Sequence, residues 1–222
     1  MERSLAPELL DSLPHEDPAA LHSRRDLRKI NRLMRTEPWF VGTLAARLRP
    51  GERVLELGAG MGELGRRLIA AGIQIDGLDR RPRPGDWPAG RAWHEVDLLE
   101  FDGFGGYDAV IVSLMLHHFT GEQLGALGRR MRDGPRLICA CEPARSRVNQ
   151  IWFRILAPFL RANHVTRHDA HVSIAAGFRG TELPRALGLA ELAWETRCRV
   201  GVFGGYRMVA VRAASGGRAA AP

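Results

Sequence analysis

Long apolar runs are absent from this chain of 222 residues. A membrane-spanning helix needs about 20 consecutive apolar residues, and no stretch of the chain approaches that length. Residues 1–18 carry acids and prolines in place of the apolar segment of a signal peptide. We therefore expect a cytoplasmic protein with no membrane insertion.

Cysteine is scarce, and its spacing excludes the usual small-domain cross-links. Cys139, Cys141 and Cys198 match neither a zinc-binding spacing nor a disulfide framework. Cys139 and Cys141 alternate within an apolar run, so we expect both thiols to lie on one buried face of a strand. The sequence thus gives no reason to expect a structural metal.

Lysine is nearly absent, since Lys29 is the only one, and the net charge of +7 comes from arginine. The arginines are spread along the chain without a block of like charge, so nucleic-acid binding is not indicated. Arg24, Arg28, Arg32 and Arg35 recur at helical spacing. We interpret them as a solvated helix face; the alternative is a basic lid or a contact with an anionic surface.

What the sequence does contain is a short apolar strand that breaks into a glycine-rich turn, between Arg53 and Gly65. Glycine permits positive φ and lets a ligand approach the backbone closely. The helix expected next, Glu63 to Ala71, offers free N–H groups at its start. A strand, a glycine turn and a helix together build a nucleotide pocket at the carboxyl end of a strand.

Two registers of this turn compete. Gly60, Gly62 and Gly65 spell the dinucleotide fingerprint G-x-G-x-x-G. That register begins two residues late, because Gly58 already follows the strand directly. Read from the strand end, the motif is instead Glu56-x-Gly58-x-Gly60-x-Gly62.

The rest of the chain alternates strands with helices. This alternation predicts an α/β fold, with a doubly wound, mostly parallel seven-stranded sheet, an antiparallel edge strand and an N-terminal helical extension. We divide the chain into an extension or lid (1–50), a main domain (51–212) and a disordered tail (213–222).

The strands are expected near 53–57 and at Gln74–Leu78, Arg91–Val96, Tyr107–Val112, Pro135–Cys141, Leu192–Val200 and Arg207–Arg212. Helices are expected at Leu5–Leu13, Pro18–Met34, Pro38–Leu48, Glu63–Ala71, Gly121–Met131 and Val148–Leu160. The proline-rich segment Arg80–Gly90 predicts a loop in place of the second crossover helix.

Further motifs follow the expected strands. Asp79 ends the second strand, 21 residues after Gly58, and a carboxylate there can accept hydrogen bonds from two ribose hydroxyls. Asp97 ends the third strand and is followed by Leu98. The fourth strand leads into Ser113-Leu114-Met115-Leu116-His117-His118, and the fifth ends in Glu142-Pro143.

With these motifs, the chain from about Val54 to Arg212 resembles the class I S-adenosylmethionine-dependent methyltransferases, in particular those acting on small molecules. The resemblance implies that an acid at Asp97 binds the adenine amino group and that the acid at Glu56 lies near the methionine amino group. Residues 25–32 also resemble the start of bacterial methyltransferases of phenolic or polyketide-like compounds. The cofactor site implied consists of Glu56, Gly58, Ala59, Gly60, Asp79, Arg80, Asp97, Leu98 and Ser113.

Methyl transfer from a sulfonium needs alignment and exclusion of water, and a base helps when the acceptor is a hydroxyl. His117 and His118 are the candidate bases, although either could instead pack or cap a helix. The histidines and Asp169 between His164 and His171 form a second candidate group. We expect no metal. Five aromatic residues could wall an apolar acceptor pocket: Trp39, Phe40, Trp152, Phe153 and Phe159.

The segment after the fourth strand lacks an N-P-P-Y-like tetrapeptide, which weakens methylation of nucleic-acid bases or glutamine. The sequence therefore favours a methyltransferase that moves a methyl group from S-adenosylmethionine to a small aromatic or lipophilic acceptor, at oxygen first and at carbon second, with S-adenosylhomocysteine as the product. The alternatives are an NAD(P)-dependent oxidoreductase and a non-catalytic S-adenosylmethionine-binding protein. The acceptor and the oligomeric state stay open.

Overall fold

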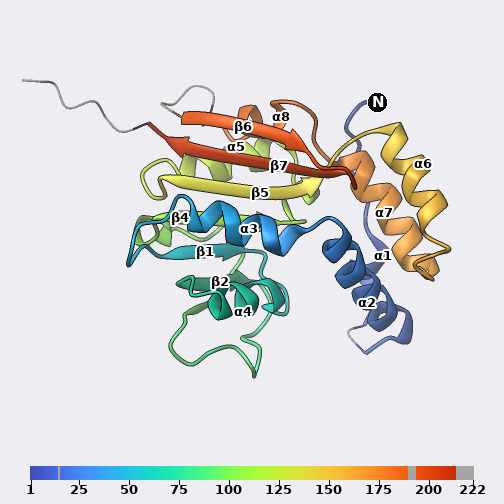
Figure 1. The fold of residues 1–222 in the computed structure, drawn as a ribbon, viewed down its shortest axis with the longest axis horizontal. Coiled ribbons are helices and arrows are strands. Elements are labelled where there is room, and N and C mark those ends of the chain that lie inside the picture. Colours follow the sequence, from blue (N-terminus) through green and yellow to red (C-terminus); the bar gives the residue numbers. More distant parts are fainter. Residues whose placement is uncertain (15, 190–193, 214–222) are drawn as a thin grey trace, which may run out of the picture.

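The computed structural model describes residues 1–14, 16–189 and 194–213. Within them, one seven-stranded sheet has the order β3-β2-β1-β4-β5-β7-β6 (Figure 1). The predicted fold is therefore confirmed. The tail beyond Ala213 and the first residues of the sixth expected strand lie outside the described residues. The strands are β1 (Val54–Leu57), β2 (Ile75–Asp79), β3 (Trp93–Glu95), β4 (Ala109–Ser113), β5 (Leu137–Pro143), β6 (Trp194–Val200) and β7 (Gly205–Arg212).

The direction of the strands changes only at the C-terminal hairpin. Strands β1 to β5 pair in parallel, whereas β7 pairs antiparallel with both β5 and β6. The antiparallel strand is thus one place in from the edge, because its hairpin partner β6 takes the outermost position. The chain order reverses between β1 and β4, and this reversal creates a crevice at their carboxyl ends.

Alternating side chains on the strands face two separate cores. On one face, Leu55 and Val110 join a cluster that includes residues of α5 (Gly121–Arg130) and α8 (Glu182–Ala186). On the other, Val54 and Ile111 pack with residues of α3 (Thr36–Ala45) and α4 (Glu63–Ala70). Cys139 and Cys141 are both fully buried on this second face, as the alternation predicted. Because apolar residues occupy both faces, the strands read as nearly continuous apolar runs.

The second crossover has no helix, as its prolines predicted. Trp87 fills the space instead: its ring is buried and lies 5.0 Å from the ring of Trp93. A Cβ added at Gly65 in α4 would come within 2.6 Å of the Trp87 ring, so the glycine is needed for this packing. One large aromatic side chain thus covers the sheet where a crossover helix is missing.

Four helices gather beyond the carboxyl end of the sheet, at the right of Figure 1. They are α1 (Leu9–Ser12), α2 (Pro18–Leu33), α6 (Arg147–Leu156) and α7 (His164–Ala176), and α7 contacts the other three. The sequence pattern did not predict α7, because its buried positions include the polar Thr166 and Asp169 rather than an apolar stripe. The short 3₁₀ turns are η1 (Gly103–Gly106) and η2 (Leu116–His118).

Candidate functional site

A cavity of about 810 Å³ opens at the carboxyl ends of β1, β2 and β4. Its walls are the loops that follow these strands and β3, together with α1, α2 and the turn η2. Every residue that the sequence nominated for cofactor contact lines it: Glu56, Gly58, Ala59, Gly60, Asp79, Arg80, Asp97, Leu98 and Ser113. The topology therefore brings together groups that are up to 57 residues apart in the sequence (113 minus 56).

The glycine turn borders this cavity with bare backbone. Gly58 follows β1 directly and has φ +66°, and Gly60 has φ +59°. A Cβ on Gly58 would lie 2.7 Å from the side chain of Met115, whereas a Cβ on Gly60 would meet nothing within 4 Å. Gly58 is thus needed for packing, and Gly60 leaves the cavity side of the turn open. Gly65 lies inside α4, so the register that begins at the strand end fits the structure.

Glu56 places a buried carboxylate beside the turn. Its side chain is buried, and Oε2 has no hydrogen-bond partner among the described residues. Burial raises the pKa of Glu56 to about 8; the nearby Gly65 N–H, which is not aligned for a hydrogen bond, opposes this rise, and the charge of Asp79 adds to it. An unpartnered buried carboxylate oxygen is costly, so the site suits a ligand that brings a cationic donor.

Two further carboxylates lie at the ends of β2 and β3. Asp79 accepts hydrogen bonds from the backbone N–H groups of Gly60 (2.7 Å) and Arg81 (2.9 Å). A carboxylate has about four acceptor positions, so Asp79 retains capacity for a ligand. Burial alone would raise the pKa of Asp97, but the Leu99 N–H and the Arg80 guanidinium lower it overall. Asp97 is therefore held as an anion on the cavity wall.

The turn η2 is held in place by Glu142, which is fully buried at the end of β5. Its carboxylate accepts the backbone N–H groups of Met115 (3.0 Å), Leu116 (2.9 Å) and His117 (3.3 Å). Leu114, just before the turn, has φ +53°, a conformation that non-glycine residues rarely adopt. Glu142 thus compensates a strained connection and fixes the direction of the His117 side chain.

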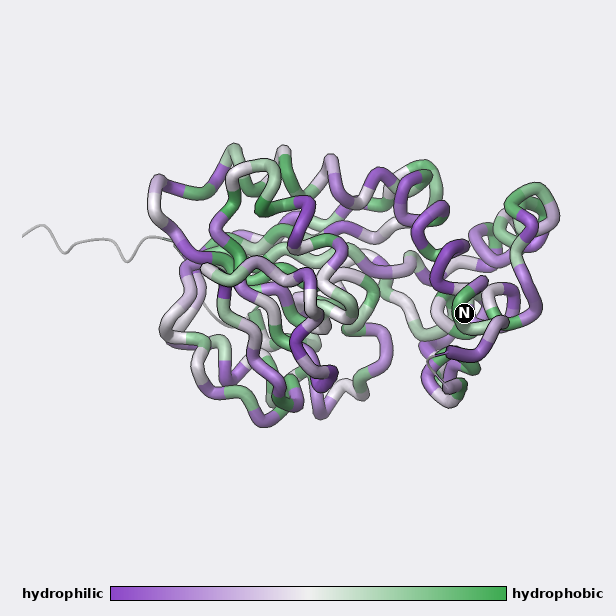
Figure 2. Tube along the Cα trace, turned by 90° about the horizontal axis from the view of Figure 1, so that it is seen from below, coloured by the Kyte–Doolittle hydropathy of each residue, from purple (hydrophilic) through white to green (hydrophobic). Residues whose placement is uncertain are grey.

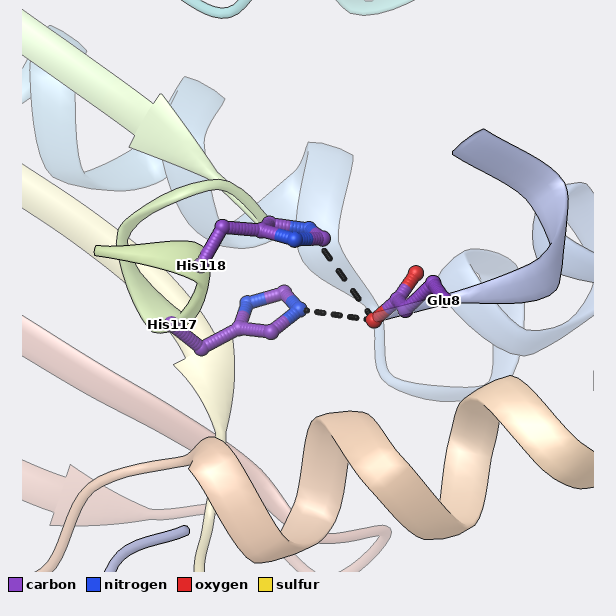
Figure 3. Close-up of side chains that lie close together, drawn as sticks. All are labelled: Glu8, His117 and His118. Carbon is purple, nitrogen blue, oxygen red and sulfur yellow. Dashed lines mark hydrogen bonds and ion pairs between the residues drawn. The ribbon is translucent and has the colours of Figure 1, made fainter. Parts of the chain in front are cut away.

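His117 does not line the cavity, and its ring lies between two carboxylates. Its Nδ1 lies 2.7 Å from Glu142 Oε2, and its Nε2 lies 3.3 Å from Glu8 Oε1 (Figure 3). Burial lowers the pKa of His117, but the hydrogen bonds with Glu142 and Glu8 outweigh it and raise the pKa to about 9. At neutral pH His117 is an imidazolium that joins the N-terminal segment to the end of β5, which makes it a poor base.

His118 has the opposite character, although it is the next residue. Its side chain is 29% exposed and lines the cavity, while its ring lies 4.3 Å from that of His117. Burial lowers the pKa of His118, and the positive charge of His117 lowers it further. A neutral imidazole at the cavity wall can accept a proton. Of the two candidate bases, the geometry therefore favours His118.

Glu8, His117 and His118 are also the residues that could hold a divalent cation. Their ligand atoms lie within 4.8 Å of one another, and all three are labelled in Figure 3. A cation would have to displace the proton from His117 Nε2. The raised pKa of His117 shows that this proton is held firmly. At neutral pH the proton and a metal therefore compete for the same position.

Two candidate features of the acceptor side lie away from this cavity. None of the five aromatic residues proposed as a pocket wall lines the cavity. Phe40 is fully buried under the sheet, and Trp152 and Phe159 are exposed on and just beyond α6. The second histidine group is also elsewhere: His168 bonds Asp169 (2.9 Å), which receives the N–H groups that begin α1. These residues assemble the N-terminal segment and do not line the cavity.

The cavity also has walls that sequence reasoning missed. Glu8 and Asp11 come from the start of the chain, and Arg24, Arg28 and Asn31 come from α2. Asn31 Oδ1 is buried without a partner among the described residues, and Arg28 pairs with Glu63 across the cavity rim (3.0 Å). In the sequence, the only indication that Arg24 and Arg28 share one side of α2 was their helical spacing. Arg24 and Arg28 thus line the cavity, whereas Arg32 and Arg35 are exposed and do not.

No protein-family model matches the chain, and no curated protein matches its sequence. Solved structures are similar in fold. The plantazolicin methyltransferase BpumL, in complex with a pentazolic desmethylPZN analog and S-adenosylhomocysteine, is 10% identical, with a TM-score of 0.70 over 92% of this chain and 93% of that chain.

Two further structures are similar over nearly their whole length. Magnesium protoporphyrin IX methyltransferase (ChlM) from Synechocystis, with bound S-adenosylhomocysteine, is 18% identical, with a TM-score of 0.60 over 90% of this chain and 96% of that chain. The methyltransferase domain of a bacterial Hen1 protein is 19% identical, with a TM-score of 0.61 over 81% of this chain and 97% of that chain. The chain thus has the fold of class I S-adenosylmethionine-dependent methyltransferases.

Proposed function

We propose that this protein is a methyltransferase that uses S-adenosylmethionine to methylate a small molecule. The observation that carries the proposal is the buried Glu56 carboxylate, whose unpartnered Oε2 lies beside a cavity lined by every nominated cofactor residue. The α-ammonium of the cofactor is a cation of the kind that this oxygen requires. The shared fold supports the same reading, because BpumL and ChlM hold S-adenosylhomocysteine.

The cavity residues fit the rest of the cofactor. Asp79 would accept the ribose hydroxyls, because its carboxylate has free acceptor capacity after the Gly60 and Arg81 N–H groups are bound. Asp97 would accept the adenine amino group, and Leu98 would pack on the ring. The open side of Gly60 would allow the cofactor to lie against the backbone. Ala59, Arg80 and Ser113 complete the walls.

When bound, the cofactor would supply a methyl group on a sulfonium, which is an already activated leaving group. The protein has to orient the acceptor and exclude water. We infer that His118 takes the proton from an acceptor hydroxyl, because it is the histidine that lines the cavity and its pKa is lowered. A metal is unnecessary for this chemistry. Oxygen is therefore the first acceptor atom to test and carbon the second.

The N-terminal segment 1–50 would serve as the cover of the acceptor side. Arg3 donates to the carbonyls of His117 (3.1 Å) and Phe119 (2.8 Å), which joins this segment to η2. The cavity volume falls in the range of small-molecule sites. We propose a small aromatic or lipophilic acceptor and no nucleic-acid substrate. No helix in residues 1–14, 16–189 and 194–213 has the length and apolarity to cross a bilayer.

Calorimetric titration with S-adenosylmethionine, S-adenosylhomocysteine, NADH and NADPH tests the cofactor. We expect the first two to bind and the nicotinamide cofactors not to bind. Binding of NAD(P)H alone would establish the oxidoreductase alternative and overturn the proposal. Phenolic and other lipophilic compounds, with methyl transfer followed by mass spectrometry, then test turnover. Cofactor binding with no transfer to any acceptor that co-purifies with the protein would favour the non-catalytic alternative.

A further inference from the structure

Helix α6 carries an apolar face that is directed away from the rest of the molecule. Val148, Ile151, Trp152 and Ile155 recur at intervals of three and four residues, and Phe159 continues the row beyond the helix. All five side chains are more than half exposed, with Trp152 at 65% and Phe159 at 81%. The helix lies at the outer end of the molecule, and the turns at the right-hand end of Figure 2 alternate between hydrophobic and hydrophilic colours. Such a row normally packs into a core, so here it requires another partner.

The acidic and basic side chains of α6 and of the segment that follows it are of one sign. From Ser146 to His168 the sequence contains no aspartate or glutamate. The four arginines of that stretch are all exposed: Arg147, Arg154, Arg161 and Arg167. Arg147 and Arg154, seven residues apart, lie along one flank of the apolar row. The face therefore combines large apolar side chains with a field that attracts anions.

A second apolar group lies next to the start of α6. The hairpin between β6 and β7 exposes Val202 (96%) and Phe203 at its tip. This tip contacts α6, because a Cβ on Gly204 would lie 3.1 Å from the Asn149 side chain. The apolar surface thus continues from α6 onto the hairpin, which gives it two points of contact with whatever covers it.

We propose that α6 and the β6–β7 tip bind the surface of an anionic lipid bilayer. Aromatic and branched side chains in a row, beside arginines and without acids, are the features of a helix that lies in the plane of a membrane interface. A second copy of this chain fits less well. In a twofold dimer formed through this face, the arginines of one copy would face the same arginines of the other copy, and the stretch supplies no carboxylate to pair with them. The binding is peripheral and independent of the methyl-transfer chemistry.

Flotation with vesicles tests the proposal in the absence of any cofactor. We expect the full chain to float with phosphatidylcholine vesicles that contain phosphatidylglycerol, and to stay largely free with pure phosphatidylcholine. Raising the salt to about 1 M shortens the Debye length to about 3 Å and should weaken the binding. The double variant W152E/F159E should lower the partition coefficient at least about tenfold. The matched control Leu21→Glu, an exposed leucine on α2, should partition like the wild type.

A third variant separates charge from apolar contact. R154E/R161E should lose the preference for anionic vesicles while leaving the apolar row intact. Thermal unfolding and S-adenosylhomocysteine binding by the same variants check that each one is folded. Failure of the wild type to float, or loss of binding by Leu21→Glu to the same extent, would overturn the proposal. So would a dimer in light scattering that W152E/F159E converts to a monomer, because the face would then join two copies.

Discussion

One side of the cavity is formed by the loops after β1, β2 and β3, and the opposite side by α1, α2 and the turn η2. The first side presents bare glycine backbone and the carboxylates Glu56, Asp79 and Asp97. The second presents imidazole, amide and guanidinium groups, including His118 and Asn31, beside the carboxylates of Glu8 and Asp11. We propose that the first side holds a ligand that is rich in hydrogen-bond donors and carries an ammonium. We propose that the second offers a base and polar anchors to an acceptor.

The same contrast exists between two adjacent histidines. His117 lies between Glu142 and Glu8 and holds a proton, whereas His118 lies beside that positive charge and gives its proton up more readily. Their different roles come from the carboxylates that tertiary contacts bring to one of them. Substitutions on the acceptor side should therefore alter the rate of methyl transfer, and those on the cofactor side should alter the affinity for the cofactor. Substitutions at His117 should alter the free energy of unfolding.

The largest effect is expected at His118. His118→Gln should lower kcat by about 10²–10⁴-fold, because general-base catalysis contributes that much, and should leave S-adenosylmethionine affinity unchanged. In the wild type, kcat should fall only below pH 6.5. The pKa of His118 is lowered from its ordinary value, so the imidazole stays neutral above that pH. Steady-state kinetics across pH measure both.

The matched control is His171→Gln, an exposed histidine that does not line the cavity. This variant should keep the turnover of the wild type. If His118→Gln also keeps it, proton removal belongs to another group and the contrast between the two histidines has no catalytic meaning.

Substitution of His117 should act on stability. A raised pKa means that the folded protein binds the proton more tightly than the unfolded chain, so the contribution is complete below about pH 6.5 and is lost as pH rises through about 9. His117→Gln should therefore lower the free energy of unfolding by about 3 kcal/mol near pH 6.5. Urea denaturation at pH 6.5 and pH 9 should show the deficit shrinking; an equal deficit at both values would contradict the charged bridge.

Removal of the Asp79 carboxylate should weaken the cofactor side. Asp79→Ala should cost about 1–3 kcal/mol of S-adenosylmethionine affinity, because charged hydrogen bonds are left unmade. Calorimetry measures the loss, and Asp86→Ala, an exposed acid in the following loop, is the control. Unchanged affinity would remove Asp79 from the site. Asp79→Asn, which retains one acceptor oxygen, should lose less.

The smallest effect is a pH dependence of affinity. With the pKa of Glu56 raised to about 8, the carboxyl is largely protonated at pH 7 and must lose its proton to meet an ammonium. Affinity for S-adenosylhomocysteine should therefore rise from pH 6 toward pH 7.5, by no more than about tenfold per pH unit. Calorimetry in buffers of different ionisation enthalpy should detect proton release by the wild type and none by Glu56→Gln. Release that persists in the variant would contradict this assignment.

Much of the cofactor side was predictable because its signals are local. Gly58 follows β1 directly and Gly60 lies in the same turn, Asp79 is the last residue of β2, and Asp97 lies just beyond β3, so parallel pairing brings them to one edge. The loop in place of the second crossover helix was predictable from its prolines. The helix α7 was not, because tertiary packing buries its polar Thr166 and Asp169 and removes the apolar stripe that identifies a helix.

The acceptor side could not be predicted, because its residues have no local signature. Glu8 is one acid among many in the first residues, and only the folded chain places it against His117. The aromatic residues of α6 read as a pocket wall in the sequence and lie on the outer surface in the structure. An amphipathic row shows that a face needs an apolar partner, and it does not show which one.

The sequence by itself determined the sheet, the glycine turn and the carboxylates at the strand ends, because backbone geometry and hydrophobic alternation act over a few residues. Tertiary structure alone decided which histidine carries a proton, which arginines line the cavity and which apolar face stays exposed. These properties depend on burial and on charges that arrive from segments more than 100 residues away, as Glu8 does at His117. Electrostatics and desolvation are set by the whole fold.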